Sequence, residues 1–306
     1  MQRYILSRII QSIFTLVAVS FVIFSMSRLS GDPLNLLLDV NATQEDKTLL
    51  AKKLGLDKSF FEQYGIFLGN AISGDLGTSI VTKAPVIDLL FDRAINTFEL
   101  GAVAFGMSLL IALPVGVYSA VKRGTFLDIL FRVISISGQS IPVFWLGLML
   151  IFLFGVILKI LPTGGKGGVL SLILPSITLG WYVAAGIMRL TRTSMLEVLR
   201  TDYMRLARIK GLSEWVVIWK HGFRNAALPV LTFAVILFVM MLGGAVVTET
   251  VFAWPGLGRL VISSVTWRDY PVVQATVLFL SLLYIIANLF VDILYAYLNP
   301  RIRYGG

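Results

Sequence analysis

The chain has 306 residues, of which 57% are hydrophobic and only 14% are charged, and its mean hydropathy is +0.85. Soluble domains carry about 25% charged residues because their surfaces face water, so this composition excludes an ordinary soluble domain. The net charge of +9 is spread between apolar runs, which favours a role in membrane orientation over nucleic-acid binding. With one histidine and no cysteine, the sequence offers neither disulfides nor the ligands of a structural zinc site.

Six runs of at least 19 residues contain no Asp, Glu, Lys or Arg. A helix of about 20 apolar residues crosses the hydrocarbon core, and only a helix satisfies its own backbone there. The first run follows Arg3 and Arg8 but exceeds the usual signal-peptide core of about 7–15 residues, so it predicts a retained helix. The expected fold is therefore an all-α integral membrane protein with six transmembrane helices, over residues 9–27, 100–121, 133–158, 167–188, 225–248 and 270–291.

The basic residues orient these spans. Six spans place both termini on one side, where residues 1–8, 122–132, 189–224 and 299–306 hold 15 of the 26 Lys and Arg. The short opposite loops, 159–166 and 249–269, hold four. The positive-inside rule therefore predicts cytosolic termini, 1–8 and 299–306. Between them we expect the first transmembrane helix, 9–27, an external segment, 28–94, and a five-helix core, 95–298, with a cytosolic loop at 189–228.

The external segment 28–94 begins with a predicted turn at Gly31-Asp32-Pro33. A capping box at Thr43–Asp46 then predicts the start of a helix. An aromatic stripe at helical spacing follows, formed by Phe60, Phe61, Tyr64, Phe67 and Leu68. Such a stripe fits an amphipathic helix in the membrane interface or a platform for a soluble partner, and the sequence leaves both open.

The cytosolic loop 189–224 has the pattern of two short helices joined at a glycine, here called the elbow. Its first helix carries an apolar stripe at helical spacing, namely Leu196, Leu199, Tyr203, Leu206 and Ala207. Lys210 closes this helix, Gly211 follows where a left-handed residue is wanted, and Ser213 can cap the second helix. A basic elbow with one apolar face suits docking into a groove on another protein or lying on anionic lipid, and both readings stay open.

The elbow resembles the EAA loop of the permeases of binding-protein-dependent ABC importers, in the dipeptide/oligopeptide/nickel branch. Residues 202–212, DYMRLARIKGL, and 224–229, RNAALP, carry this resemblance. It covers nearly the whole chain, with recurring blocks at residues 31–33, 74–77, 249–258 and 268–274. Where the eponymous motif has Glu-Ala-Ala, this loop has Thr201-Asp202-Tyr203, a departure that the branch commonly tolerates.

The resemblance implies an ABC type I importer transmembrane fold and a permease that forms half of a pathway for peptides or nickel and metal chelates. The implied partners are a second homologous permease, as a heterodimer or a homodimer, two cytosolic ATPase subunits, a periplasmic or lipid-anchored substrate-binding protein and lipid of the bacterial inner membrane. ATP and Mg would act on the ATPase subunits, and this chain would bind no cofactor, metal or nucleic acid. The implied ATPase-coupling residues are Asp202, Tyr203, Arg205, Leu206, Ala207, Lys210, Gly211 and Leu212.

The sequence agrees with a non-catalytic role. It contains no G-x-x-x-x-G-K-[ST] loop, and the glycines around Lys166 lack that spacing and hydroxyl. The main alternative is a secondary transporter, whose fold usually shows internal repeats and broken helices at the midplane. A membrane-embedded enzyme would need clustered acids or histidines, and neither alternative explains the elbow. We interpret the polar residues in or beside spans, Gln139, Glu249, Asn288 and Asp292, as helix contacts. We interpret the prolines in spans, Pro114, Pro142 and Pro175, as static kinks.

Overall fold

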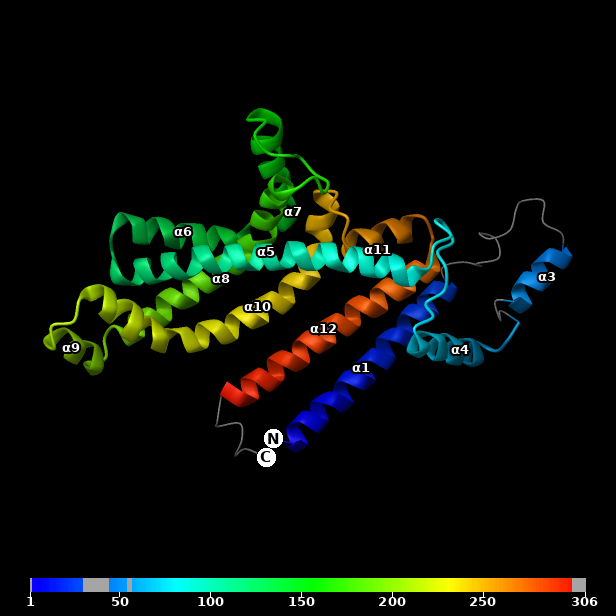
Figure 1. The fold of residues 1–306 in the computed structure, drawn as a ribbon, viewed down its shortest axis with the longest axis horizontal. Coiled ribbons are helices and arrows are strands. Elements are labelled where there is room, and N and C mark those ends of the chain that lie inside the picture. Colours follow the sequence, from blue (N-terminus) through cyan, green and yellow to red (C-terminus); the bar gives the residue numbers. More distant parts are fainter. Residues whose placement is uncertain (1, 30–43, 54–56, 299–306) are drawn as a thin grey trace. The chain divides into compact units, whose positions relative to one another are not determined.

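The computed structural model describes residues 2–29, 44–53 and 57–298 (Figure 1). In this part the structure is helical, apart from turns and one isolated bridge between Thr78 and Pro85. The helices are α1 (Gln2–Leu29), α3 (Gln44–Lys53), α4 (Phe60–Ser73), α5 (Val86–Val121), α6 (Phe126–Ser140), α7 (Val143–Leu150), α8 (Val169–Val198), α9 (Asp202–Ile209), α10 (Arg224–Val251), α11 (Leu257–Thr266) and α12 (Tyr270–Leu298), with π-helical stretches η1 (Ile151–Ile157) and η2 (Val216–Phe223).

Five of the six predicted spans are present as long apolar helices. They are Leu6–Leu29, Val86–Val121, Val169–Val198, Val216–Val251 and Tyr270–Ile293. The described chain has a sixth if the bent pair Phe126–Ser140 and Val143–Ile157 is counted as one span. The predicted all-α membrane fold is therefore confirmed. The turn at residues 31–33, the capping residue Thr43 and the terminus 299–306 lie outside the described residues, although the helix expected after Thr43 is present as α3.

The run 133–158 is not the straight helix that we expected. The chain bends by 113° between α6 and α7. Ile141 has an extended backbone, with φ −82° and ψ 125°, and Pro142 directly precedes α7. Proline lacks the amide hydrogen that would continue the helix and disfavours a helical conformation in the residue before it. Pro142 therefore breaks the span, whereas Pro114 and Pro175 lie inside the continuous helices α5 and α8.

Reporter fusions can establish whether the bent pair crosses the membrane. We expect reporters after Arg123 and Arg200 to read cytosolic and reporters after Lys52 and Thr163 to read external, because the basic loops fix the orientation. A re-entrant pair would return the chain to its starting side. A cytosolic reading at Thr163, together with a cytosolic reading at Arg123, would therefore contradict a six-span topology.

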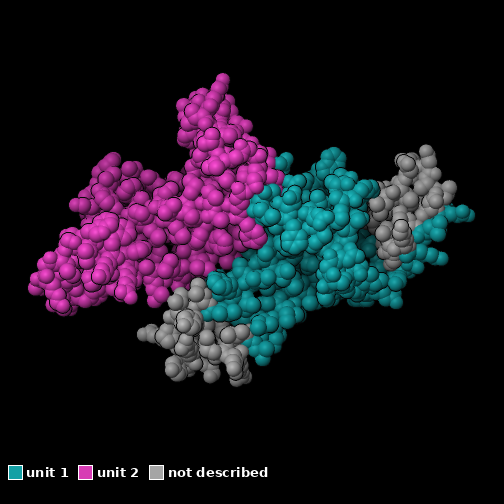
Figure 2. All heavy atoms as spheres, in the orientation of Figure 1, with its two compact units in different colours: residues 1–96, 256–306 teal, residues 97–255 magenta. Residues whose placement is uncertain are grey.

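The chain packs as two compact units, residues 1–96 with 256–306 and residues 97–255, which Figure 2 colours separately. In the first unit α12 packs along α1, and the Arg8 guanidinium lies 3.3 Å from the Asp292 carboxylate. By packing, α12 thus groups with the first span and with α11.

The aromatic stripe of α4 is used within this first unit. A capping box between Ser59 and Glu62 starts the helix, and its rings join those of α1 in a cluster of Phe21, Phe24, Phe60, Tyr64 and Phe67. The Tyr64 hydroxyl lies 2.8 Å from that of Ser20. Edge-to-face rings of this kind stabilise helix contacts. The aromatic stripe therefore packs α4 against the first span. Neither of the two interpretations from the sequence included this contact.

Two of the sequence blocks also meet in the first unit. The buried carboxylate of Asp269, in the block 268–274, accepts hydrogen bonds from the Ser79 hydroxyl at 2.5 Å and from the Ile80 amide at 3.1 Å. Ser79 lies two residues after the block 74–77. These bonds connect segments 190 residues apart. Asp269 therefore holds the segment before α5 against the start of α12.

The second unit is organised around α8, which packs against α6, α7 and α10. Small residues bring the helices close together, as is usual in membrane proteins. The Ser108 hydroxyl of α5 donates to the Gly180 carbonyl at 2.9 Å, and a Cβ at Gly180 would lie only 2.8 Å from the Ala104 carbonyl oxygen. Likewise, a Cβ at Gly138 of α6 would lie 2.5 Å from that of Ala185. This core holds the cytosolic end of α8, from which the elbow extends.

Candidate functional site

The elbow lies between α8 and the span Val216–Val251. Helix α8 ends at Val198, and α9 begins four residues later, at Asp202. A second helix begins at Glu214 and continues without interruption into α10. The two-helix arrangement of the elbow is confirmed. The apolar stripe that was predicted for one helix, however, is divided between the end of α8 and α9. The second helix, in turn, is the start of the fifth predicted span rather than a separate element.

Thr201 accounts for the break in the first helix. Its backbone is extended, with φ −75° and ψ 153°, and its hydroxyl donates to the Val198 carbonyl at 2.6 Å. A threonine hydroxyl that bonds to a nearby carbonyl competes with the helical hydrogen-bond pattern. The Thr201 carbonyl in turn accepts the Met204 amide at 3.2 Å, which starts α9 in a new direction.

Gly211 adopts the left-handed conformation that the sequence predicts. Its φ is +76°, and its amide donates to the Arg208 carbonyl at 2.9 Å. Glycine takes this conformation without the steric cost that a Cβ imposes. Across the turn, Arg208 Nε lies 2.8 Å from a carboxylate oxygen of Glu214. The glycine therefore reverses the chain, and the ion pair joins the end of α9 to the start of the next helix.

One face of α9 is anchored inward. Met204 is fully buried and Ala207 is nearly so, and both pack with Val217 of η2 and with the end of α8. Gly222 makes room for them, because a Cβ there would lie 3.2 Å from the Met204 methyl carbon. Of the eight coupling residues that the resemblance implies, Ala207 thus lies on the inner side of the helix. Met204, which the predicted stripe left out, is the main anchor.

The other face of the elbow is exposed. Leu206 is 56% exposed and Ile209 is 80% exposed. The remaining coupling residues are exposed as well, namely Asp202, Tyr203, Arg205, Lys210, Gly211 and Leu212. An apolar patch with a rim of charges has the composition of a protein docking surface. The elbow therefore combines a buried anchor with an outward patch suited to a groove on a partner.

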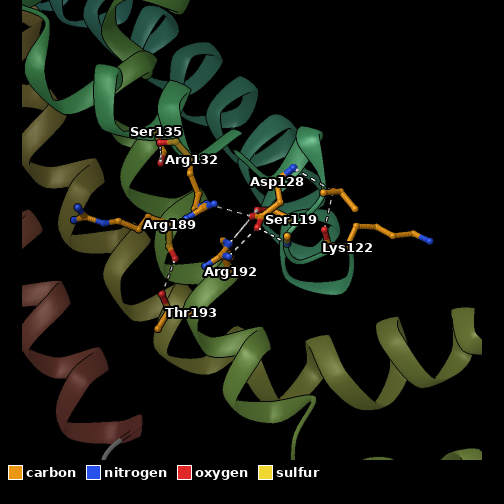
Figure 3. A network of polar contacts seen from close by, with 10 residues as sticks. Ser119, Lys122, Asp128, Arg132, Ser135, Arg189, Arg192 and Thr193 are labelled. Carbon is orange, nitrogen blue, oxygen red and sulfur yellow. Dashed lines mark hydrogen bonds and ion pairs between the residues drawn. The ribbon is translucent and has the colours of Figure 1, made fainter. Parts of the chain in front are cut away.

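A buried ion pair supports the base of the elbow (Figure 3). The Asp128 carboxylate on α6 is 1% exposed and accepts two hydrogen bonds from Arg192 of α8, from Nε at 2.8 Å and from Nη2 at 3.1 Å. The Ser119 hydroxyl donates to the same carboxylate at 2.5 Å and the Gly124 amide at 3.0 Å. This network ties the turn between α5 and α6 to the last turns of α8.

Sequence reasoning did not identify this pair, because its partners lie 64 residues apart. The available signal was a single acid, Asp128, in the short basic loop 122–132. An acid at such a membrane edge needs a partner when it is buried. Several basic residues on the same side could have filled that role, so the signal indicated a pair without identifying it.

Of the other polar residues in or beside spans, Glu249 and Asp292 contact a neighbouring helix, as interpreted from the sequence, whereas among the residues that the structure describes Asn288 and Gln139 do not. Glu249 is fully buried and accepts a hydrogen bond from the Thr97 hydroxyl at 2.6 Å. Asn288 donates to the Tyr284 carbonyl within α12 at 2.9 Å. Gln139 is exposed on α6. Within the described residues, no group of three or more acids or histidines is placed to hold a metal ion.

The outer glycine-rich loop around Lys166 is held by an ion pair, a cation–π contact and a backbone hydrogen bond. The Lys166 ammonium lies 2.5 Å from the Glu99 carboxylate and 5.6 Å from the centre of the Trp254 ring. The Gly165 amide donates to the Phe252 carbonyl at 2.7 Å. These contacts place the loop against the block 249–258.

Comparisons with known proteins cover both the spans and the elbow. Residues 112–304 match the family described as "Binding-protein-dependent transport system inner membrane component", and residues 1–101 match its N-terminal family. The "Glutathione transport system permease protein GsiC" of Escherichia coli O6:H1 is 44% identical over 305 residues, which cover 99% of this chain and all of that protein. Its counterpart in Shigella boydii serotype 4 is 43% identical with the same coverage. Among solved structures, a chain of the inward-facing MetNI methionine ABC transporter has a similar fold, with a TM-score of 0.56, 22% identity, and coverage of 70% of this chain and 98% of that one.

Proposed function

Because this chain belongs to the family of binding-protein-dependent transport system inner membrane components, we propose that it forms half of an importer's translocation pathway and couples to ATPase subunits through the elbow. The family membership makes it a permease subunit of an ABC importer, a multi-pass protein of the bacterial inner membrane. Such permeases are non-catalytic, so the chain is not an enzyme.

The observation that carries the coupling proposal is the two-sided construction of α9. Met204 and Ala207 fix the helix to the body of the second unit, while Leu206 and Ile209 face outward. A force on the outward residues would therefore pass through the buried anchor to α8 and η2. An amphipathic helix lying on lipid has no need of an anchor on its opposite face. We accordingly favour docking into a protein groove over a purely lipid-facing role.

The proposed assembly contains a second six-span permease, two cytosolic ATPase subunits and an external substrate-binding protein. ATP and Mg are used by the ATPase subunits, and this chain supplies no residue to that reaction. Closure of the ATPase dimer would move the elbow, and the spans would then rock between inward-open and outward-open states.

For the cargo, we propose a small peptide-like molecule of the glutathione class. The support is the 44% identity, over 99% of the chain, to a permease described as a glutathione transport protein. Nickel or a metal chelate is the other cargo class implied by the branch. Ligand retained by the copurified binding protein tests this assignment, since a chelated metal in place of a peptide-like molecule would contradict it.

The substitution Gly211→Val tests the coupling role. A Cβ at Gly211 would meet no atom within 4 Å, so the variant acts through its φ of +76° and not through a clash. A Cβ in this conformation costs about 1–2 kcal/mol or more, and the turn should relax away from its native geometry. We expect normal membrane insertion but a loss of about tenfold or more in ATPase association and coupled ATP hydrolysis.

Gly74→Val is the matched control. Gly74 also follows a helix, has a φ of +85° and leaves the same open space for a Cβ. Gly74 lies in the external segment, so backbone strain from a valine at this position should leave ATPase association unchanged. Copurification of the ATPase subunits from membranes provides the readout. Wild-type association and hydrolysis in Gly211→Val would remove the elbow from the coupling mechanism, while the family assignment would stand.

A further inference from the structure

A hollow with an excess of positive charge lies beside the buried ion pair. It has a volume of about 690 Å³ and opens between the α5–α6 turn and the last turns of α8. Its charged lining consists of Arg123, Asp128, Arg132, Arg192, Glu197 and Arg200. Figure 1 shows the α5–α6 turn and α9 at the same end of the second unit, which is the cytosolic end by the orientation derived above.

The charges of this hollow are not balanced internally. Asp128 is already paired with Arg192 through two hydrogen bonds. The nearest nitrogen of Arg132 lies 3.7 Å from the same carboxylate. Within the described part of the chain, the structure records no ion pair for Arg123 or Arg200. Four guanidinium groups thus line the hollow against the two carboxylates of Asp128 and Glu197, and this excess of two positive charges leaves a site for an anion.

An apolar surface continues from the charged hollow. A second hollow of about 230 Å³ shares Arg132, Thr193 and Arg192 with the first. Its other lining residues are the apolar Phe131, Ile136 and Met188 and the polar Ser119, Ser135 and Arg189. Ile136 is 62% exposed, and Phe126, at the start of α6, is 76% exposed. Because α6 belongs to the bent apolar pair, we expect this face to meet hydrocarbon. A free anion would use only the charged hollow, whereas a molecule with a phosphate and an acyl chain would use both.

We propose that these two hollows form a binding site for an anionic phospholipid. The phosphate lies among Arg123, Arg132 and Arg200, and an acyl chain follows α6 past Phe131 and Ile136. Basic pockets between helices at the cytosolic face recognise such headgroups. The bound lipid bridges the α5–α6 turn to Arg200, which directly precedes the turn into α9. The lipid thus steadies the base of the elbow from the membrane side.

Lipid binding by the purified complex tests this site. The full chain, with the subunits that copurify, is titrated in detergent with phosphatidylglycerol, with phosphatidylcholine as the uncharged-headgroup comparison. The double variant Arg123→Gln/Arg200→Gln removes two exposed charges and keeps the Asp128–Arg192 pair. We expect it to bind phosphatidylglycerol about 25-fold more weakly, since each basic residue at an anionic membrane surface contributes about fivefold. Binding of phosphatidylcholine should not change.

The matched control is Lys220→Gln/Arg224→Gln. It removes the same charge from exposed positions of the cytosolic loop 189–224, outside both hollows. It should retain wild-type affinity for phosphatidylglycerol. Equal weakening of phosphatidylglycerol binding in both double variants, or no weakening in the first, would contradict the proposed site. Displacement of the lipid by inorganic phosphate at a similar concentration would show a free-anion site and overturn the phospholipid assignment.

Discussion

The substitution Asp128→Ala is expected to lower the free energy of unfolding by about 3–5 kcal/mol. Arg192, whose side chain is 18% exposed, would keep its position without a carboxylate, and breaking one partner of a buried pair leaves an uncompensated charge. The Gly124 amide and the Ser119 hydroxyl would lose their acceptor as well. Unfolding of the purified chain in a denaturing detergent measures this loss.

Asp202→Ala makes the same chemical change in an exposed pair. Asp202 is 91% exposed and lies 3.5 Å from Arg205. Exposed pairs contribute about 0–1 kcal/mol, so its loss should be small. Replacing the buried pair by Asp128→Leu with Arg192→Met should recover most of the stability, because apolar side chains of similar size carry no desolvation penalty. A loss in Asp128→Ala no larger than that in Asp202→Ala would contradict the structural role of the pair.

The substitution Ile209→Glu is expected to reduce ATPase association by about 30-fold or more and to abolish coupled uptake. Ile209 is the most exposed apolar side chain of α9, and a central contact of an interface is worth about 2 kcal/mol or more. A carboxylate there would be buried against the partner groove without a counter-charge. Because Ile209 is not part of the buried anchor of α9, the substitution should leave the stability of the folded chain unchanged.

Ile72→Glu controls for the added charge. Ile72 on α4 is also 80% exposed, but it lies in the external segment. ATPase copurification should therefore match the wild type in this variant and fall in Ile209→Glu. Similar ATPase recovery for both variants would mean that the outward face of α9 does not bind the ATPase subunits.

The sequence predicted those features that depend on local rules. Runs free of charge located the long helices, since hydropathy and helix length act within one segment. Gly211 was predicted to be left-handed because a helix end requires a residue without a Cβ. Pro142 carried the signal for the bend, but we interpreted it as a static kink. Its combination with an extended Ile141 shows that a proline can end a membrane helix as well as bend it.

Features that depend on long-range packing could not be predicted. The apolar stripe did not include Met204, which is buried because it packs against Val217 and because Gly222 of the next helix leaves room for it. Helical spacing gives a set of residues on one face but not which neighbour will cover them. The aromatic stripe of α4 shows the same limit, since its partner Phe24 lies in the first span.

The uninterrupted helix that leaves the elbow has a mechanical consequence. Its α-helical part, Arg224–Val251, has 28 residues, which at 1.5 Å per residue makes a rod of about 42 Å. If such a rod tilts by about 10° around one end, its other end moves by roughly 7 Å. That distance is close to the width of a small peptide. A modest rotation imposed at the cytosolic end would therefore be enlarged, without any local unfolding, into a gap wide enough for cargo at the far side of the membrane.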